Sequence, residues 1–207
     1  MQAIERTYGW TPEAPHSCAY LVDPVVALVR ASGARRVLDL GCGNGHLCRR
    51  LRAEGFDVVG MEPDAEGAAQ ARRLAPGLRV HALGVDHAPA DLLANEAPFD
   101  LVVSTEVVEH LYAPRRLPRF AAAVLVPRGQ LLLTTPYHGY WKNLAIALAG
   151  RWDHHHTALW EGGHIKFFSR ATLGRLLDEE GFDVTGFQGV GRLPGLWKSM
   201  IVAGRRR

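Results

Sequence analysis

The stretch VLDLGCGNGHL, residues 37–47, decides the fold of this chain. Its apolar run stops abruptly at Gly41, and the segment from Gly45 to Glu54 then has the pattern of a helix, with Gly55 just beyond its end. A strand, a glycine loop and a helix in this order are typical of a parallel sheet, in which ligands bind beyond the carboxyl ends of the strands. The loop is therefore the first candidate for a ligand site.

The glycines of this loop depart from the pattern that binds a dinucleotide. That pattern is G-x-G-x-x-G, whereas Gly45 follows Gly41 and Gly43 one place early, and the Lys-Ser/Thr pair of a P-loop is missing. Asp39 stands two places before the first glycine, where it would repel phosphates and attract a cation. A ligand with an ammonium group and no phosphate fits better, although a strand-to-helix turn can also need glycines for its backbone shape alone.

Outward from the loop, strands and helices alternate. The apolar pattern predicts strands at 36–40, 57–62, 78–83, 99–105, 130–135, 182–190 and 198–203. It predicts helices at 19–31, 45–54, 65–74, 121–126 and 170–180, with Asp64 and Ser169 as N-caps of the third and last. This alternation favours a parallel, doubly wound α/β sheet. It breaks between residues 136 and 165, where we expect a long insert over the edge of the sheet.

The composition is that of an ordinary globular domain. The chain has 207 residues, 47% hydrophobic and 22% charged, which excludes disordered and fibrous proteins and predicts a single domain. A net charge of +3 is too small to indicate a nucleic-acid surface. We find no apolar segment of the roughly 18 residues that span a membrane and no signal-peptide core. We therefore expect a soluble, cytoplasmic protein whose three cysteines are reduced.

Two further acids follow the next predicted strands. Glu62 lies about 20 residues after the glycine loop, where a carboxylate accepts hydrogen bonds from the hydroxyls of a ribose. Asp86 could accept from an adenine amino group, and Val85 could add backbone contacts. Glu62 could instead be a surface carboxylate at the start of a helix, and Asp86 could be present for turn geometry alone.

Together these motifs resemble those of the class I S-adenosylmethionine-dependent methyltransferases. VLDLGCGNGHL is similar to the glycine motif of that family, and GMEP (60–63) to its ribose-binding acid. FDLVVSTEVVEHL (99–111) is similar to the fourth-strand motif, and RGQLLLTTP (128–136) to the fifth strand. The resemblance spans residues 35 to 190. It implies a Rossmann-like, doubly wound sheet of seven mostly parallel strands with one antiparallel strand, and S-adenosylmethionine as methyl donor.

The resemblance also implies roles for residues and segments. It implies that Asp39, Gly41 and Gly43 flank the methionine part of the cofactor and that Glu62 binds the ribose. Val85 and Asp86 would border the adenine. Ser104 and Thr105 would line the floor of the site. It implies one methyltransferase domain over 1–207, divided into a lid and helix at 1–34, a cofactor-binding core at 35–135, a substrate-side insert at 136–168 and a C-terminal helix with strands at 169–207.

Three polar residues after the fourth predicted strand could hold a metal ion. Glu106, Glu109 and His110 are spaced so that a helical turn would place them on one face. Two carboxylates and an imidazole suit a divalent cation, and Mg²⁺ is the candidate because the ligands are mostly oxygen. The ubiquinone-biosynthesis O-methyltransferases have a similar E-x-x-E-H that is linked to magnesium. These residues could instead only shape the turn, as a similar Glu-His pair does in metal-independent methyltransferases.

GGHIKFF, residues 162–168, contains a candidate general base. The same O-methyltransferases have a glycine-flanked histidine before an aromatic residue, so His164 could accept the proton of the methyl acceptor, and His110 is a second candidate. His164 could instead only anchor the insert to a backbone carbonyl. We expect the run His154 to His156 on the surface, since adjacent side chains of an extended segment alternate and do not converge on one ion.

The predicted function is methyl transfer to a small-molecule hydroxyl. A planar or aromatic acceptor under a lid would suit the aromatic residues of the N-terminal segment and the insert, which are Tyr8, Trp10, Tyr137, Tyr140, Trp141, Trp152 and Trp160. They would equally suit packing of the lid on itself. The alternatives are a nucleic-acid or protein methyltransferase, which lacks support because the Asn-Pro-Pro-Tyr signature is missing, and a non-catalytic nucleotide-binding module. The acceptor and the oligomeric state do not follow from the sequence.

Overall fold

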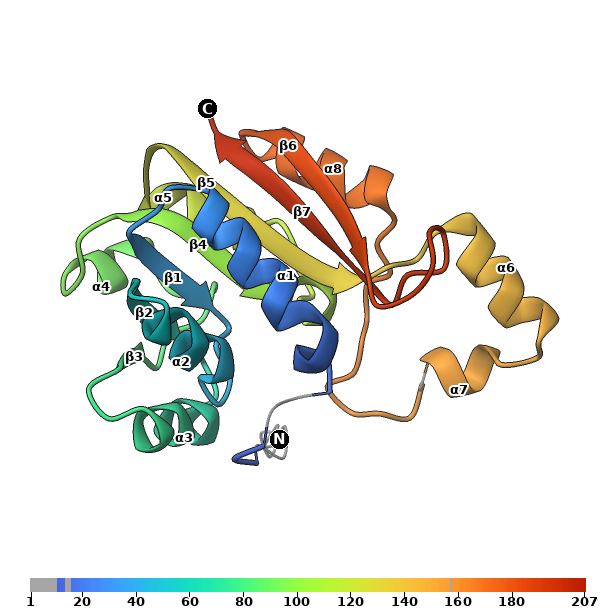
Figure 1. The fold of residues 1–207 in the computed structure, drawn as a ribbon, viewed down its shortest axis with the longest axis horizontal. Coiled ribbons are helices and arrows are strands. Elements are labelled where there is room, and N and C mark those ends of the chain that lie inside the picture. The colour runs from blue at the N-terminus through green and yellow to red at the C-terminus, as the bar shows by residue number, and fades with distance from the viewer. Residues whose placement is uncertain (1–10, 14–15, 157) are drawn as a thin grey trace.

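The computed structural model describes residues 11–13, 16–156 and 158–207, which form a seven-stranded sheet covered by helices (Figure 1). Its strands are β1 (Arg36–Leu40), β2 (Asp57–Met61), β3 (Arg79–His81), β4 (Phe99–Thr105), β5 (Leu125–Pro136), β6 (Phe182–Val190) and β7 (Ser199–Arg206). Their order in the sheet is β3-β2-β1-β4-β5-β7-β6. The first five strands run parallel, and β7 runs antiparallel to both β5 and β6. The predicted mostly parallel sheet with one antiparallel strand is confirmed.

Helices cover both faces of the sheet. They are α1 (Cys18–Ala31), α2 (His46–Ala53), α3 (Ala65–Leu74), α4 (Pro89–Leu93), α5 (Arg116–Val124), α6 (Tyr140–Leu148), α7 (Trp152–His156) and α8 (Arg170–Glu179), with a 3-10 turn, η1 (Val108–His110). One apolar cluster packs α1, α2 and α3 on the sheet, and a second packs α4, α5 and α8. Leu131 and Leu133 belong to one cluster and Leu132 to the other. Since both faces are buried, the strands are continuous apolar runs.

The helix starts that the sequence predicted are capped as expected. The Asp64 carboxylate accepts a hydrogen bond from the amide of Gly67 at 2.8 Å, at the start of α3. Ser169 and Thr172 form a reciprocal capping box at the start of α8. Both predicted N-caps are therefore confirmed.

Two predicted elements differ from the structure, and one helix was not predicted. The helix expected at 121–126 covers Arg116–Val124, and Leu125 already pairs with Phe99 of β4, so the last two residues of the predicted helix belong to β5. The short α4 has no predicted counterpart. The insert is helical, and Figure 1 shows α6 and α7 beyond the end of β5 and away from the sheet, where we had expected a segment over its edge.

None of the helices in the described ranges is both long enough and apolar enough to cross a membrane.

Candidate active site

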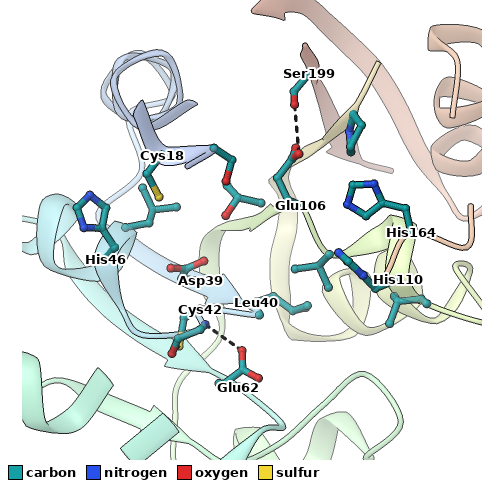
Figure 2. A pocket seen from close by; sticks show the side chains of 18 of the residues that line it. Cys18, Asp39, Leu40, Cys42, His46, Glu62, Glu106, His110, His164 and Ser199 are labelled. Atoms are coloured by element: carbon teal, nitrogen blue, oxygen red, sulfur yellow. Dashed lines mark hydrogen bonds between the residues drawn. The ribbon is translucent and has the colours of Figure 1, made fainter. Parts of the chain in front are cut away.

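A cavity of about 970 Å³ opens at the carboxyl ends of the parallel strands (Figure 2). Its two ends differ in the segments that line them. The glycine-loop end is lined by residues at the end of β1 and in the segments after β1, β2 and β3, among them Asp39, Gly41, Glu62 and Asp86. The insert end is lined by residues of η1, of the insert at 136–168, which contains α6, and of the β6–β7 loop. Among them are His110, Lys142, His164 and Arg192, and Glu106, which follows β4, also lies there.

The glycine loop is held against the end of β2. The amides of Gly41 and Cys42 both donate to the carbonyl of Met61, at 2.7 and 3.0 Å. Gly41 has φ +83°, and a Cβ there would lie 2.5 Å from Cγ2 of Val107. Gly45 is also left-handed, at φ +74°, and a Cβ there would lie 3.0 Å from Cβ of Ala71. The early third glycine therefore allows both a sharp turn and close packing of α2.

Asp39 presents an unpaired carboxylate oxygen in this loop. The side chain is buried, and the Cys48 thiol donates to Oδ2 at 3.2 Å. Oδ1 has no hydrogen-bond partner within the described part of the chain. Burial raises the pKa of Asp39 to about 7, an effect that the Cys48 hydrogen bond opposes. A buried acceptor without a donor is costly, so this geometry suits a cationic donor such as the expected ammonium group.

Glu62 is fixed in position by two backbone amides. Its Oε2 accepts from Gly43 and its Oε1 from Asp64, both at 2.9 Å (Figure 2 shows the first). Burial raises the pKa of Glu62, and these two hydrogen bonds lower it in part. An ionised carboxylate has about four lone-pair positions, so Glu62 can accept two further hydrogen bonds from hydroxyl groups in the cavity. This arrangement fits the predicted ribose contact.

The remaining predicted cofactor residues divide into two groups. Val85, Asp86 and Thr105 line the cavity, and the exposed Asp86 also pairs with Arg116. Ser104 does not line the described cavity, because its buried hydroxyl donates to the carbonyl of Leu40 at 2.7 Å. Adjacent side chains of a strand point to opposite faces, so Thr105 reaches the cavity and Ser104 does not. The expectation that Ser104 lines the floor is corrected accordingly.

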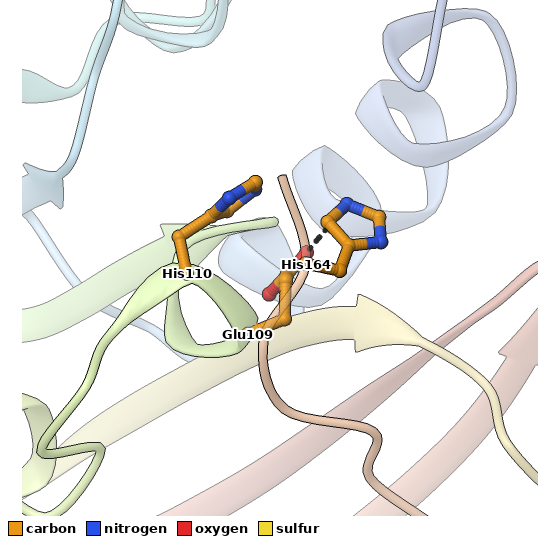
Figure 3. Close-up of side chains that lie close together, drawn as sticks. All are labelled: Glu109, His110 and His164. Carbon is orange, nitrogen blue, oxygen red and sulfur yellow. Dashed lines mark ion pairs between the residues drawn. The ribbon is translucent and has the colours of Figure 1, made fainter. Parts of the chain in front are cut away.

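The structure assembles a different polar cluster from the one that the spacing predicted. Ligand atoms of Glu109, His110 and His164 lie within 4.8 Å of one another (Figure 3). Glu106 lies apart from them, because its positive φ of 54° ends the strand and the helical turn starts only at Val108. Its carboxylate accepts from the hydroxyls of Thr134 and Ser199, at 2.9 and 3.2 Å. His164 therefore takes the place expected for Glu106.

This cluster contains a buried acid beside two imidazoles. Neither carboxylate oxygen of Glu109 has a hydrogen-bond partner among the described residues, and burial and the Glu106 charge raise its pKa well above the usual value. Nε2 of His164 lies 4.0 Å from Oε1 of Glu109. The carbonyl of Gly162 accepts from Nδ1 of His110 at 2.8 Å, which fixes the orientation of the ring.

The donors of the cluster do not fit Mg²⁺, the candidate metal. Magnesium prefers oxygen ligands in octahedral geometry, whereas two of the three donors here are imidazole nitrogens. Such a set is typical of transition metals. The oxygen-rich set that favoured Mg²⁺ depended on Glu106, which the structure places elsewhere.

The histidine run is helical rather than extended. It forms most of α7, where His154 is exposed and His155 lines the cavity. The ring of His155 lies 5.8 Å from that of His138. Burial, followed by the neighbouring Lys142 charge, lowers the pKa of both imidazoles to about 4. None of the three histidines is buried, so the expected surface segment is confirmed, although its conformation is helical and His155 also lines the cavity.

The sequence also missed several cavity residues. Lys142, Arg192, Lys198 and His138 line the insert end without having been singled out. The only local signal was a lone lysine inside the apolar run WKNLAIAL.

The predicted aromatic residues take different positions. Trp160 lines the cavity, Tyr140, Trp141 and Trp152 are exposed, and Tyr137 packs against Trp197. Tyr8 and Trp10 lie outside the described residues.

Known proteins share this chain's sequence pattern. A family model described as a methyltransferase domain matches residues 13–186. The chain is 32% identical over 165 residues to a ubiquinone biosynthesis O-methyltransferase of Bradyrhizobium diazoefficiens, which covers 76% of this chain and 62% of that protein. A protein of the same name from Rhodopseudomonas palustris is 30% identical over 155 residues, which covers 72% and 59%. The chain thus spans about three fifths of the length of these curated relatives.

A solved structure shares the fold. The magnesium protoporphyrin IX methyltransferase from Synechocystis PCC 6803 with bound SAH has a TM-score of 0.64 and 20% identity, covering 90% of this chain and 81% of that one.

Proposed function

This chain belongs to the methyltransferase domain family, and from that premise we propose that it transfers the methyl group of S-adenosylmethionine to a hydroxyl of a small-molecule acceptor. The observation that carries the proposal is the unpaired, buried oxygen of Asp39 at the glycine loop. It suits the ammonium of the methionine part of that cofactor. Glu62, fixed by two amides, would accept from the ribose hydroxyls, and Val85 with Asp86 would border the adenine.

When bound, S-adenosylmethionine supplies an electrophilic methyl group on a sulfonium. The protein then has to align the acceptor oxygen with that methyl and remove the hydroxyl proton. His164 lines the cavity and would take this proton; burial lowers its pKa to about 4, so the imidazole is neutral at pH 7, and a group that stabilises the imidazolium is needed to strengthen it as a base. Glu109 lies 4.0 Å away, and a positive charge on the His164 ring would favour ionisation of this carboxyl, whose pKa is otherwise raised, so that the two charges would stabilise each other. His110 packs against His164, with ring centroids 4.8 Å apart, and would orient it.

The choice of oxygen as the methylated atom rests on the relatives. Two of them carry the name ubiquinone biosynthesis O-methyltransferase. Because this chain spans about three fifths of their length, we extend to it the atom that is methylated and not their acceptor.

Calorimetry on the full chain tests the cofactor part of this proposal. We expect S-adenosylmethionine and S-adenosylhomocysteine to bind and NAD to bind at least tenfold more weakly, since Asp39 attracts an ammonium and repels a pyrophosphate. Tighter binding of NAD would overturn the proposal. Transfer of labelled methyl groups to a panel of phenols, matched amines and thiols then tests the atom, and transfer to an amine or thiol alone would refute O-methylation.

A further inference from the structure

Helix α6 has the reverse of the usual burial pattern. Its exposed apolar residues include Tyr140, Trp141 and Leu148, which are 72%, 67% and 80% exposed. Lys142, only 4% exposed, is its one buried residue. Burying an ammonium while aromatic rings face solvent is unfavourable for folding alone, because a charge loses hydration and apolar surface stays wet. Such local inconsistency is typical of a binding site.

The ammonium of Lys142 has spare hydrogen-bonding capacity in the cavity. Nζ donates to the carbonyl of Lys198 at 3.2 Å, and it forms no ion pair with a carboxylate of the described residues. An ammonium has three donors, so two remain for a ligand. Burial, and then the neighbouring charge of Arg192, lowers the pKa of Lys142 to about 8. An anion bound beside it would offset both effects.

A second cation lies at the same end. Arg192, on the β6–β7 loop, lines the cavity, is exposed, and has no carboxylate partner within the described ranges. Arg115, by contrast, pairs with Glu179 and Glu180 on the surface. The carboxylate that does line this end, that of Glu106, already accepts hydrogen bonds from two hydroxyls.

The two cations are separate from the ammonium site at the glycine loop. Nζ of Lys142 donates to the carbonyl of Lys198, the residue before β7, whereas Asp39 lies on β1, and β4 and β5 separate these two strands in the sheet. The anion that suits Lys142 and Arg192 therefore lies at the insert end of the cavity, away from the glycine loop.

We propose that the methyl acceptor carries an anionic group, a carboxylate or a phosphate, which Lys142 and Arg192 bind at the insert end of the cavity. This inference rests on the proposed function, because it assigns the insert end to the acceptor. Lys142 would donate from a buried, fixed position, and Arg192 would close over the anion from the loop. Trp160 and Phe167 line the same end and would contact a planar ring that bears the group.

Binding of benzoate and of its neutral isostere benzamide tests the proposal. Calorimetry or ligand-observed NMR would use the full chain, both alone and saturated with S-adenosylhomocysteine. We expect benzoate to bind at least tenfold more tightly than benzamide, and Lys142→Gln to remove that preference without changing benzamide binding. Equal binding of the two probes by the unmodified protein would overturn the proposal. Phenyl phosphate provides a second arm, and its preference over benzoate would identify the anion as a phosphate.

Two further variants keep the test decisive. Arg192→Gln changes an exposed loop residue, so it should fold even if Lys142→Gln does not, and we expect it to weaken benzoate binding about fivefold. Arg73→Gln, an exposed position on α3 outside the cavity lining, is the matched control and should change nothing.

Cofactor affinity separates this inference from the proposed function. We expect Lys142→Gln and Arg192→Gln to keep the affinity for S-adenosylhomocysteine within twofold. If they weaken it as much as they weaken benzoate binding, the cations hold the carboxylate of the cofactor and the inference is wrong. If S-adenosylhomocysteine does not bind the unmodified protein at all, the proposed function fails, and the benzoate preference of the protein alone still decides whether an anion site exists.

Discussion

The two ends of the cavity are built in different ways. The glycine-loop end follows consecutive parallel strands, carries the acids Asp39, Glu62 and Asp86, and is fixed by backbone hydrogen bonds. The insert end collects side chains from segments more than 80 residues apart, such as His110 and Arg192, and includes cations that form no ion pair with the described carboxylates. The comparison teaches that a cofactor site can be a local property of the fold, whereas acceptor specificity depends on segments added around it.

The largest effect that separates the two ends should come from His164→Ala. Removing a general base typically costs about 100- to 10,000-fold in rate, and we expect such a loss of kcat with the affinity for S-adenosylmethionine unchanged. Steady-state methyl transfer and calorimetry measure the two quantities. His154→Ala, at an exposed position of α7, is the control. A loss of less than threefold would show that His164 is not the base.

Glu62→Ala, in contrast to His164→Ala, should weaken binding of the cofactor and should not affect the methyl-transfer step. Two hydrogen bonds to a charged acceptor contribute about 1.5 kcal/mol each, so we expect affinity for S-adenosylmethionine to fall about 100-fold. Glu66→Ala, exposed on α3, should leave it unchanged. Unchanged affinity in Glu62→Ala would contradict the ribose contact.

The buried Asp39, at the glycine-loop end, should make the free energy of unfolding of the protein depend on pH. Its pKa is about 7 when folded and near 3.8 when unfolded, so the folded state holds the extra proton between these values. The stabilisation of the folded state by this proton is complete below pH 4 and is lost as pH rises towards 7. It contributes at most about 4 kcal/mol to the free energy of unfolding. Thermal unfolding at pH 5 and pH 8 should show a drop in Tm several degrees larger for the unmodified protein than for Asp39→Asn. Equal drops would show that Asp39 ionises normally.

The smallest expected effect is that of a chelator on the insert end. Because two imidazoles and one acid do not suit Mg²⁺, and because His164 can act as base without a metal, we expect EDTA to change methyl transfer by less than twofold. Loss of activity that Mn²⁺ or Zn²⁺ restores would instead establish Glu109, His110 and His164 as a metal centre.

The sequence predicted the sheet and much of the glycine-loop end. Apolar runs marked each of the seven strands, and Asp39, Gly41, Glu62 and Asp86 all line the cavity. Ser104 was misplaced because the pattern does not say which face of β4 turns to the cavity near its end. At the insert end, Glu106 was grouped with Glu109 on the assumption of a continuous helical turn, which the positive φ at Glu106 prevents.

The sequence by itself determined the parallel sheet and its glycine loop, because strand periodicity, glycine spacing and caps are local features whose consequences lie within a few residues. The tertiary structure alone decided that His164 joins Glu109 and that Lys142 turns inward beside Arg192. Those contacts join segments dozens of residues apart, and burial changes the charge that such groups can carry, so no local pattern encodes them.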